Sequence, residues 1–321
     1  MKPYTDIPAE HLKRLYAMML RIRLFEDRVA ELYSEQEIKC PVHLCIGQEA
    51  IAAGVCIHLK PEDTIFSTHR SHGHCIAKGM DLSSIAAELY GKETGCCRGR
   101  GGSMHLAAPE IGIPGTTAIV GGCIPLAVGA ALSSFLQKSN SVAVAFFGDG
   151  AVDEGTFHES LNFASLKKLP VVFVCENNFY ATNSPQKARQ PEVGIADRGL
   201  SYGIPGECHD GNDVIGVYLS AAEAVRRARA GQGPVLLEYR TYRWKAHVGP
   251  DSDIEKGARP KDEYEEWVRR CPVECFERQL IEQKALTSDE SAEILRLVEA
   301  EVKEAMEFGK KSPYPDPAGL T

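Results

Sequence analysis

Oxygen-bearing side chains follow two apolar runs in the middle of the chain. The run at 141–147, SVAVAFF, leads into Gly-Asp-Gly at 148–150, and the run at 170–176, PVVFVCE, leads into Asn-Asn at 177–178. Continuous apolar runs of this length are typical of parallel strands buried on both faces. The segment between them, 154–168, has apolar residues at helical spacing. The pattern predicts a strand, a helix and a second parallel strand.

The carboxyl ends of parallel strands form the ligand-binding edge of open α/β sheets, so we expect the Asp149 carboxylate and the Asn178 amide to lie close together. Mg²⁺ prefers such oxygens and often shares them with a bound phosphate. Gly148 and Gly150 allow close approach of the backbone, and the following helix N-terminus favours an anion. A turn-capping role would explain Asp149 alone or Asn178 alone. Together they favour a magnesium diphosphate site.

Nucleotide sites of two common kinds are not indicated. The sequence has no Walker loop, and no predicted strand is followed by GxGxxG with a downstream acidic residue.

The remaining sequence predicts the elements that position this site. Helical periodicity at 9–33 and a second helix at 46–58 precede a polar, His-rich loop, 66–80, that enters another helix. Nine glycines at 91–122 predict an irregular loop. Helices are then predicted at 124–136, 220–230 and 288–309, with a further strand at 233–244 and a Pro-rich tail.

The alternation of strands and helices predicts an α/β fold: a doubly wound, mostly parallel sheet with helices on both faces and extra N- and C-terminal helices. We expect a single domain over 1–321, with helical extensions at 1–40 and 260–321.

Composition narrows the class of protein. The 321 residues are 44% apolar and carry a net charge of −8 with both signs mixed, which argues against a nucleic-acid or membrane-surface partner. The N-terminus lacks a signal-peptide core, and no run approaches the roughly 20 apolar residues of a membrane span. We expect a cytoplasmic protein. Eleven irregularly spaced cysteines without paired CxxC spacing indicate neither disulfides nor a structural zinc site.

Several segments together resemble a known family. Gly-Asp-Gly followed about thirty residues later by Asn-Asn is similar to the thiamin diphosphate binding motif. The wider match consists of HLCIGQEA, HRSHGHCIAKG, GGSMH, IVGGCIPLAVGAAL, GDGAVDEGTFHESLNFASLKKLPVVFVCENNFYA and YRWKAHVGPDSD. These resemble, in order over residues 10–270, the alpha subunit of the decarboxylating first component of 2-oxo acid dehydrogenase complexes, with the bacterial pyruvate and acetoin type nearest.

The resemblance implies roles for particular residues. Magnesium ligands would be Asp149, Asn178 and the Tyr180 main-chain oxygen. The residues implied to contact thiamin diphosphate are His69, Arg70, Ile119, Val120, Gly121, Gly148, Asp149, Gly150, Ala151, Asn178 and His247. Three histidines match active-site histidines of the family, where an imidazole can move a proton or stabilise an oxyanion: His43, His72 and His247.

Two places depart from the family pattern. His69 stands where relatives usually have Tyr. In the loop 246–259, Val248 replaces a Ser and Ala258 precedes Arg259, which leaves Ser252 as the candidate equivalent hydroxyl.

The resemblance also implies partners and a reaction. In this superfamily the Glu that activates thiamin diphosphate belongs to a separate pyrimidine-binding domain. We expect no second domain of that kind in this chain. A beta subunit would supply it, in a two-alpha, two-beta enzyme. The implied reaction, in EC class 1.2.4.-, is oxidative decarboxylation of a 2-oxo acid, or cleavage of acetoin, with acyl transfer to the lipoyl group of an acyltransferase component.

Two alternatives remain open. One is a thiamin-dependent acyl or ketol transferase of a biosynthetic pathway, favoured by the altered loop 246–259. The other is a non-catalytic interaction subunit that kept the fold.

Overall fold

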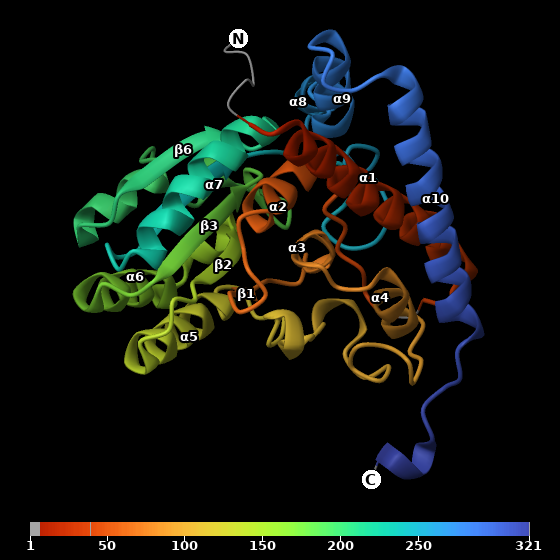
Figure 1. Ribbon diagram of the computed structural model, residues 1–321, viewed down its shortest axis with the longest axis horizontal. Coiled ribbons are helices and arrows are strands. Elements are labelled where there is room, and N and C mark those ends of the chain that lie inside the picture. The colour runs from red at the N-terminus through yellow and green to blue at the C-terminus, as the bar shows by residue number, and fades with distance from the viewer. Residues whose placement is uncertain (1–6, 39, 321) are drawn as a thin grey trace.

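The computed structural model, which describes residues 7–38 and 40–320, contains a five-stranded, fully parallel sheet, on the left in Figure 1. Across the sheet the strands lie in the order β1 (Thr64–Phe66), β2 (Ala143–Gly148), β3 (Val171–Asn177), β7 (Val235–Arg240) and β6 (Gly206–Asp210). A separate antiparallel pair joins β4 (Tyr180–Ala181) to β5 (Ser184–Pro185).

Helices cover both faces of the sheet, because successive side chains of a strand point to opposite faces. In β2, Val144 and Phe146 belong to one hydrophobic core, whereas Ala145 and Phe147 belong to the other. The first core includes α2 (Glu49–Cys56) and α7 (Val214–Arg229), and the second includes α5 (Cys123–Gln137) and α6 (Gly155–Lys167). The predicted α/β fold with helices on both faces is confirmed.

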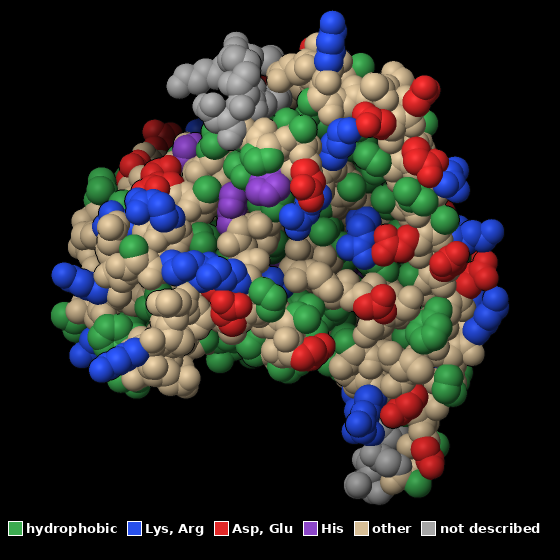
Figure 2. Space-filling model, in the orientation of Figure 1, with side chains coloured by type: hydrophobic (Ala, Val, Ile, Leu, Met, Phe, Trp, Pro, Cys, Tyr) green, Lys and Arg blue, Asp and Glu red, His purple; other side chains and the backbone are tan. Residues whose placement is uncertain are grey.

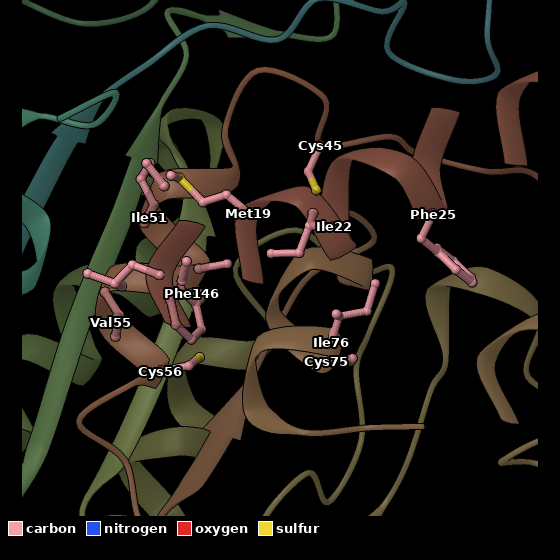
Figure 3. Close-up of a cluster of buried hydrophobic side chains, with 14 of the residues drawn as sticks. Met19, Ile22, Phe25, Cys45, Ile51, Val55, Cys56, Cys75, Ile76 and Phe146 are labelled. Atoms are coloured by element: carbon pink, nitrogen blue, oxygen red, sulfur yellow. The ribbon is translucent and has the colours of Figure 1, made fainter. Parts of the chain in front are cut away.

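The N-terminal helix α1 (Ala9–Leu32) packs into the first core. Its Met19, Ile22 and Phe25 are fully buried beside α2 and α3 (His72–Lys78), as Figure 3 shows. The residues predicted as an N-terminal extension therefore include a helix that forms part of the main core.

The C-terminal helices are α8 (Lys261–Arg269), α9 (Pro272–Glu282) and α10 (Ser288–Lys311). A capping box between Thr287 and Glu290 begins α10. This helix runs along α1 and α4 (Leu82–Leu89), on the side of the molecule away from α6 (Figure 1). A Cβ atom at Gly309 would lie 2.8 Å from the Ala86 carbonyl carbon, so glycine permits the close approach of α10 to α4.

Two strands of the five-stranded sheet, β1 and β6, were not predicted, and both lie at its edges. The three residues of β1 are too few to form a pattern, and β6 is half buried to exposed along its length, so neither has a continuous apolar run. The helix predicted at 220–230 begins earlier, at Val214, where the Asp213 side chain accepts a hydrogen bond from the Ile215 amide at 3.1 Å.

The surface carries both signs of charge. On the face drawn in Figure 2, acidic and basic side chains are interspersed. Among the described residues, none of the helices combines the length and apolar character that crossing a bilayer requires.

Candidate active site

A pocket of about 130 Å³ lies at the carboxyl ends of β2 and β3. Ten of the residues that the sequence assigned to the site line it: His69, Arg70, Val120, Gly148, Asp149, Gly150, Ala151, Asn178, Tyr180 and His247. The two strands pair in parallel register with Gly148 opposite Glu176, so the residues that follow them emerge at one edge.

The remaining assigned residues lie elsewhere. His43 packs against the lining residue His69, with the two ring centroids 4.7 Å apart. The Ile119 side chain is 72% exposed. Gly121 has a left-handed φ of 79°, and a Cβ atom there would lie 3.1 Å from Thr156 Cγ2.

His72 does not line the pocket. It is fully buried, with Nδ1 at 3.0 Å from Glu26 Oε1 and Nε2 at 2.9 Å from Ser103 Oγ. These contacts join α1 and α3 to the glycine-rich segment. This position fits a structural histidine.

Asp149 begins a 3-10 turn, Asp149–Asp153, between β2 and α6. Its side chain is almost fully buried, and this burial raises the carboxyl pKa while the adjacent Arg189 opposes the shift. Arg189 donates to Asp149 through one terminal nitrogen and to Asp153 through the other. Sequence reasoning missed Arg189, because no periodic pattern links it to an aspartate forty residues away.

Asn178 presents its amide to the pocket. Its Nδ2 donates to Gln48 Oε1 at 3.3 Å, and its Oδ1 accepts from the Tyr180 amide at 3.3 Å. Gln48 also lines the pocket, and its own Nε2 is buried without a hydrogen-bond partner among the described residues. Sequence reasoning did not assign Gln48, although it lies within the quoted segment HLCIGQEA.

The donors and the space fit an anionic group with a divalent cation. A buried carboxylate and an amide oxygen suit Mg²⁺, and the unpartnered Gln48 amide has a hydrogen bond to give. A Cβ atom at Gly150 would lie 2.9 Å from Ala181 Cβ, so glycine lets β4 approach the end of β2. The residues present can therefore hold a magnesium diphosphate.

Three imidazoles form a cluster at one side of the pocket. Ring centroids are 4.7 Å apart for His43 and His69, and 5.2 Å apart for His247 with each of the others. Burial, helped by the charge of Arg70, lowers the pKa of His43 to about 3, of His69 to about 2 and of His247 to about 4. The cluster is neutral at pH 7, so each ring has one donor and one acceptor.

The spacing of these rings could also hold a metal ion, since their ligand atoms lie within 4.8 Å of one another. The Arg70 guanidinium beside them disfavours a cation. A second group with metal-ligand spacing among the described residues is Glu88, Cys96 and Cys97. In that group Glu88 already accepts backbone hydrogen bonds from Cys97 and from Gly99, among others.

Arg70 is buried and joins the pocket to the loop 246–259. Its Nη1 donates to the Leu44 carbonyl oxygen, and its Nη2 donates to the His247 carbonyl oxygen at 3.3 Å. The loop is held by buried Asp253, which lies 3.0 Å from Arg243 and 3.4 Å from Arg259. Buried ion pairs therefore fix the loop that carries His247.

Comparison with known proteins agrees with this geometry. The sequence model of the dehydrogenase E1 component family matches residues 16–318. The chain belongs to this family. It is 44% identical over 307 residues to the alpha subunit of acetoin:2,6-dichlorophenolindophenol oxidoreductase of Bacillus subtilis, covering 95% of this chain and 91% of that protein.

Further E1 relatives carry pyruvate dehydrogenase names. The pyruvate dehydrogenase E1 component subunit alpha of Rhizobium meliloti is 38% identical over 308 residues, covering 96% of this chain and 88% of that protein. The chloroplastic E1 subunit alpha-3 of Arabidopsis thaliana is 40% identical over 315 residues, covering 96% of this chain and 73% of that protein. The predicted resemblance to E1 alpha subunits is confirmed.

Proposed function

We propose that this protein is the alpha subunit of a thiamin diphosphate-dependent E1 enzyme that acts on pyruvate, a related 2-oxo acid or acetoin. One observation carries the proposal: Asp149 and Asn178, which follow adjacent parallel strands, line one pocket together with Arg70. The names of the relatives support the same activity.

Mg²⁺ would be held by the Asp149 carboxylate, the Asn178 amide oxygen and the Tyr180 main-chain oxygen. The backbone of Gly150 and Ala151 would hold the diphosphate, with Arg70 as its counter-charge, because a guanidinium matches phosphate oxygens in a planar fork. When bound, the cofactor supplies an electron sink for breaking the bond beside a carbonyl group.

The neutral histidines act on the substrate. His247 and His69 line the pocket, and His43 packs against both. A neutral imidazole can donate its N–H to a developing oxyanion and accept a proton at its other nitrogen. Burial favours such hydrogen bonds because water does not compete for them.

A beta subunit completes the site. Val120, which lines the pocket, is 46% exposed and its neighbour Ile119 is 72% exposed, although both are apolar. A partner that covers them and brings the activating Glu accounts for this exposure. The assembled enzyme passes its acyl group to the lipoyl group of an acyltransferase component, in the cytoplasm.

Reconstitution tests the proposal. The purified chain alone should show little turnover of pyruvate or acetoin, and addition of a beta subunit, Mg²⁺ and thiamin diphosphate should restore it. Full activity without a beta subunit would contradict the proposal. A complete but inactive assembly would instead favour a non-catalytic subunit.

The acyl acceptor separates the proposed enzyme from a biosynthetic acyl or ketol transferase. Val248, which replaces a family Ser, is 46% exposed in the loop after β7 and keeps that alternative open. Acyl transfer to an added lipoyl domain supports the E1 activity, whereas transfer only to free aldehydes supports the alternative.

A further inference from the structure

The guanidinium of Arg189 lies between two carboxylates at the proposed cation site. One terminal nitrogen donates to Asp149 Oδ2, and the other donates to Asp153 Oδ2. The next residue, Gln190, donates to the Asp149 main-chain oxygen at 2.8 Å and to Asp153 Oδ1 at 2.7 Å. Two successive side chains therefore hold the same pair of acidic residues.

Burial explains why Asp149 needs this partner. Its residue is only 1% exposed, and a buried carboxylate without a counter-charge strongly destabilises a fold. Arg189, whose side chain is 16% exposed, supplies that charge. A divalent cation bound at the same carboxylate would supply it as well.

The Arg189 guanidinium and a Mg²⁺ bound at Asp149 would repel each other. A guanidinium and Mg²⁺ that both touch Asp149 would repel strongly in a site shielded from water. Cation binding therefore weakens the ion pair of Arg189 with Asp149 Oδ2 and favours withdrawal of Arg189, so part of the binding energy is spent on breaking this pair.

Arg189 belongs to a segment that can move with it. The strap, residues 184–190, is half buried or exposed from Ser184 to Arg189. The β4–β5 pairing at Ser184–Pro185 holds its start. Hydrogen bonds hold the rest: the Gln186 amide to the Phe179 carbonyl oxygen at 2.7 Å, Asn177 Nδ2 to Gln186 Oε1 at 3.1 Å, Arg198 Nη2 to Gln190 Oε1 at 3.1 Å, and Gln190 Nε2 to the aspartates. The strap thus joins the turn after β3 to the turn after β2.

We propose that Arg189 is a built-in competitor of the divalent cation, which neutralises Asp149 in the cofactor-free chain and withdraws with the strap when Mg²⁺ and the diphosphate enter. This inference rests on the proposed function. It assigns to Arg189 control of cation affinity and makes the cofactor-free site stable until it is filled.

Metal binding tests this without measuring activity. The chain assembled with its beta subunit is titrated with Mn²⁺ in the presence of thiamin diphosphate, and free Mn²⁺ is measured by electron paramagnetic resonance. Arg189→Ala should bind Mn²⁺ about tenfold more tightly. This corresponds to a latch, meaning the ion pair of Arg189 with Asp149, that is closed about nine-tenths of the time. Arg189→Lys, which keeps the charge but loses the planar fork, should be intermediate.

A stability readout accompanies the titration. Without metal, Arg189→Ala should melt at a lower temperature than the wild type, because Asp149 loses its counter-charge. Addition of Mn²⁺ and thiamin diphosphate should then raise its melting temperature by more than it raises that of the wild type.

Lys187→Ala is the matched control, since Lys187 is an exposed cation of the same strap outside the two ion pairs of Arg189. Equal tightening by this control would mean that general charge, rather than the latch, sets the affinity, and would overturn the inference. Unchanged or weaker Mn²⁺ binding by Arg189→Ala would also overturn it.

Asp149→Asn separates failure of the latch from failure of the site. If this variant loses Mn²⁺ binding while Arg189→Ala binds as the wild type does, the cation site stands and the latch is wrong. If Asp149→Asn binds Mn²⁺ as tightly as the wild type, the proposed cation site is wrong and the latch is wrong with it.

Discussion

Asn177 Nδ2 donates a hydrogen bond of 2.8 Å to Glu238 Oε1, which ties the end of β3 to β7. The same side chain accepts from the Phe179 amide at 3.1 Å, in a turn where Phe179 has a left-handed φ of 67°. Asn178 follows on this turn and lines the pocket. The two asparagines thus divide into two roles: Asn177 shapes the turn, and Asn178 presents an oxygen to the pocket.

This division predicts different effects for two similar substitutions. Asn177→Ala removes partners from buried groups and should lower the free energy of unfolding by about 1–3 kcal/mol. Asn178→Ala should change it by less than about 1 kcal/mol but abolish cation-dependent cofactor binding. Urea unfolding and Mn²⁺ titration of both variants provide the measurement, and a stable Asn177→Ala with Asn178→Ala still binding Mn²⁺ would contradict the division.

Asp253 should be a main support of the loop 246–259. Its substitution by Asn leaves Arg243 and Arg259 without their buried counter-charge and should cost about 3 kcal/mol or more of unfolding free energy. Proteolysis within the loop should become faster. Asp251→Asn is the control, because the Asp251 pair with Lys256 is exposed and should contribute under about 1 kcal/mol. Similar losses for both variants would show that burial of the Arg pairs is unimportant.

The cluster of His43, His69 and His247 should make stability fall in acid. Between pH 6.5 and about 4, the unfolded chain binds protons at His43, His69 and His247 that the folded chain does not bind. The free energy of unfolding therefore decreases as pH falls through this window, by at most about 1.4 kcal/mol per pH unit for each histidine. His69→Asn should flatten the decrease in urea unfolding at pH 7, 6 and 5.

Exposed His105 provides the control for loss of an imidazole. If His105→Asn reduced the pH dependence of the unfolding free energy as much as His69→Asn does, burial of the histidine cluster would not explain that dependence.

Two glycines of the same region should respond differently to alanine. At Gly150 an added Cβ would lie 2.9 Å from Ala181 Cβ, so the substitution should lower stability by about 1–3 kcal/mol and weaken cofactor binding. At Gly155, the first residue of α6, nothing lies within 4 Å of the added atom, and alanine should be neutral or stabilising. Thermal unfolding with and without cofactor compares the two, and equal effects would argue against the close approach of β4.

The sequence predicts those elements whose own residues form a clear local pattern. The central strands β2 and β3 are buried on both faces and read as apolar runs, whereas the edge strands β1 and β6 have no such pattern. Asp149 was found because it follows a strand directly. Arg189 reaches Asp149 from forty residues away, a contact that only the folded chain creates.

His72 illustrates a different limit. A histidine within a family motif reads the same whether it faces a ligand or the core. Only its hydrogen bonds to Glu26 and Ser103 place it in the core.

The central claim is that Asp149 binds a divalent cation that holds a diphosphate. Calorimetric titration of thiamin diphosphate into the chain assembled with its beta subunit tests it most directly, in Mg²⁺ and after chelation. We expect binding at one site per chain that requires Mg²⁺ and is weakened about a hundredfold or more by Asp149→Asn. Binding of equal affinity without Mg²⁺, or in the Asp149→Asn enzyme, would contradict the account.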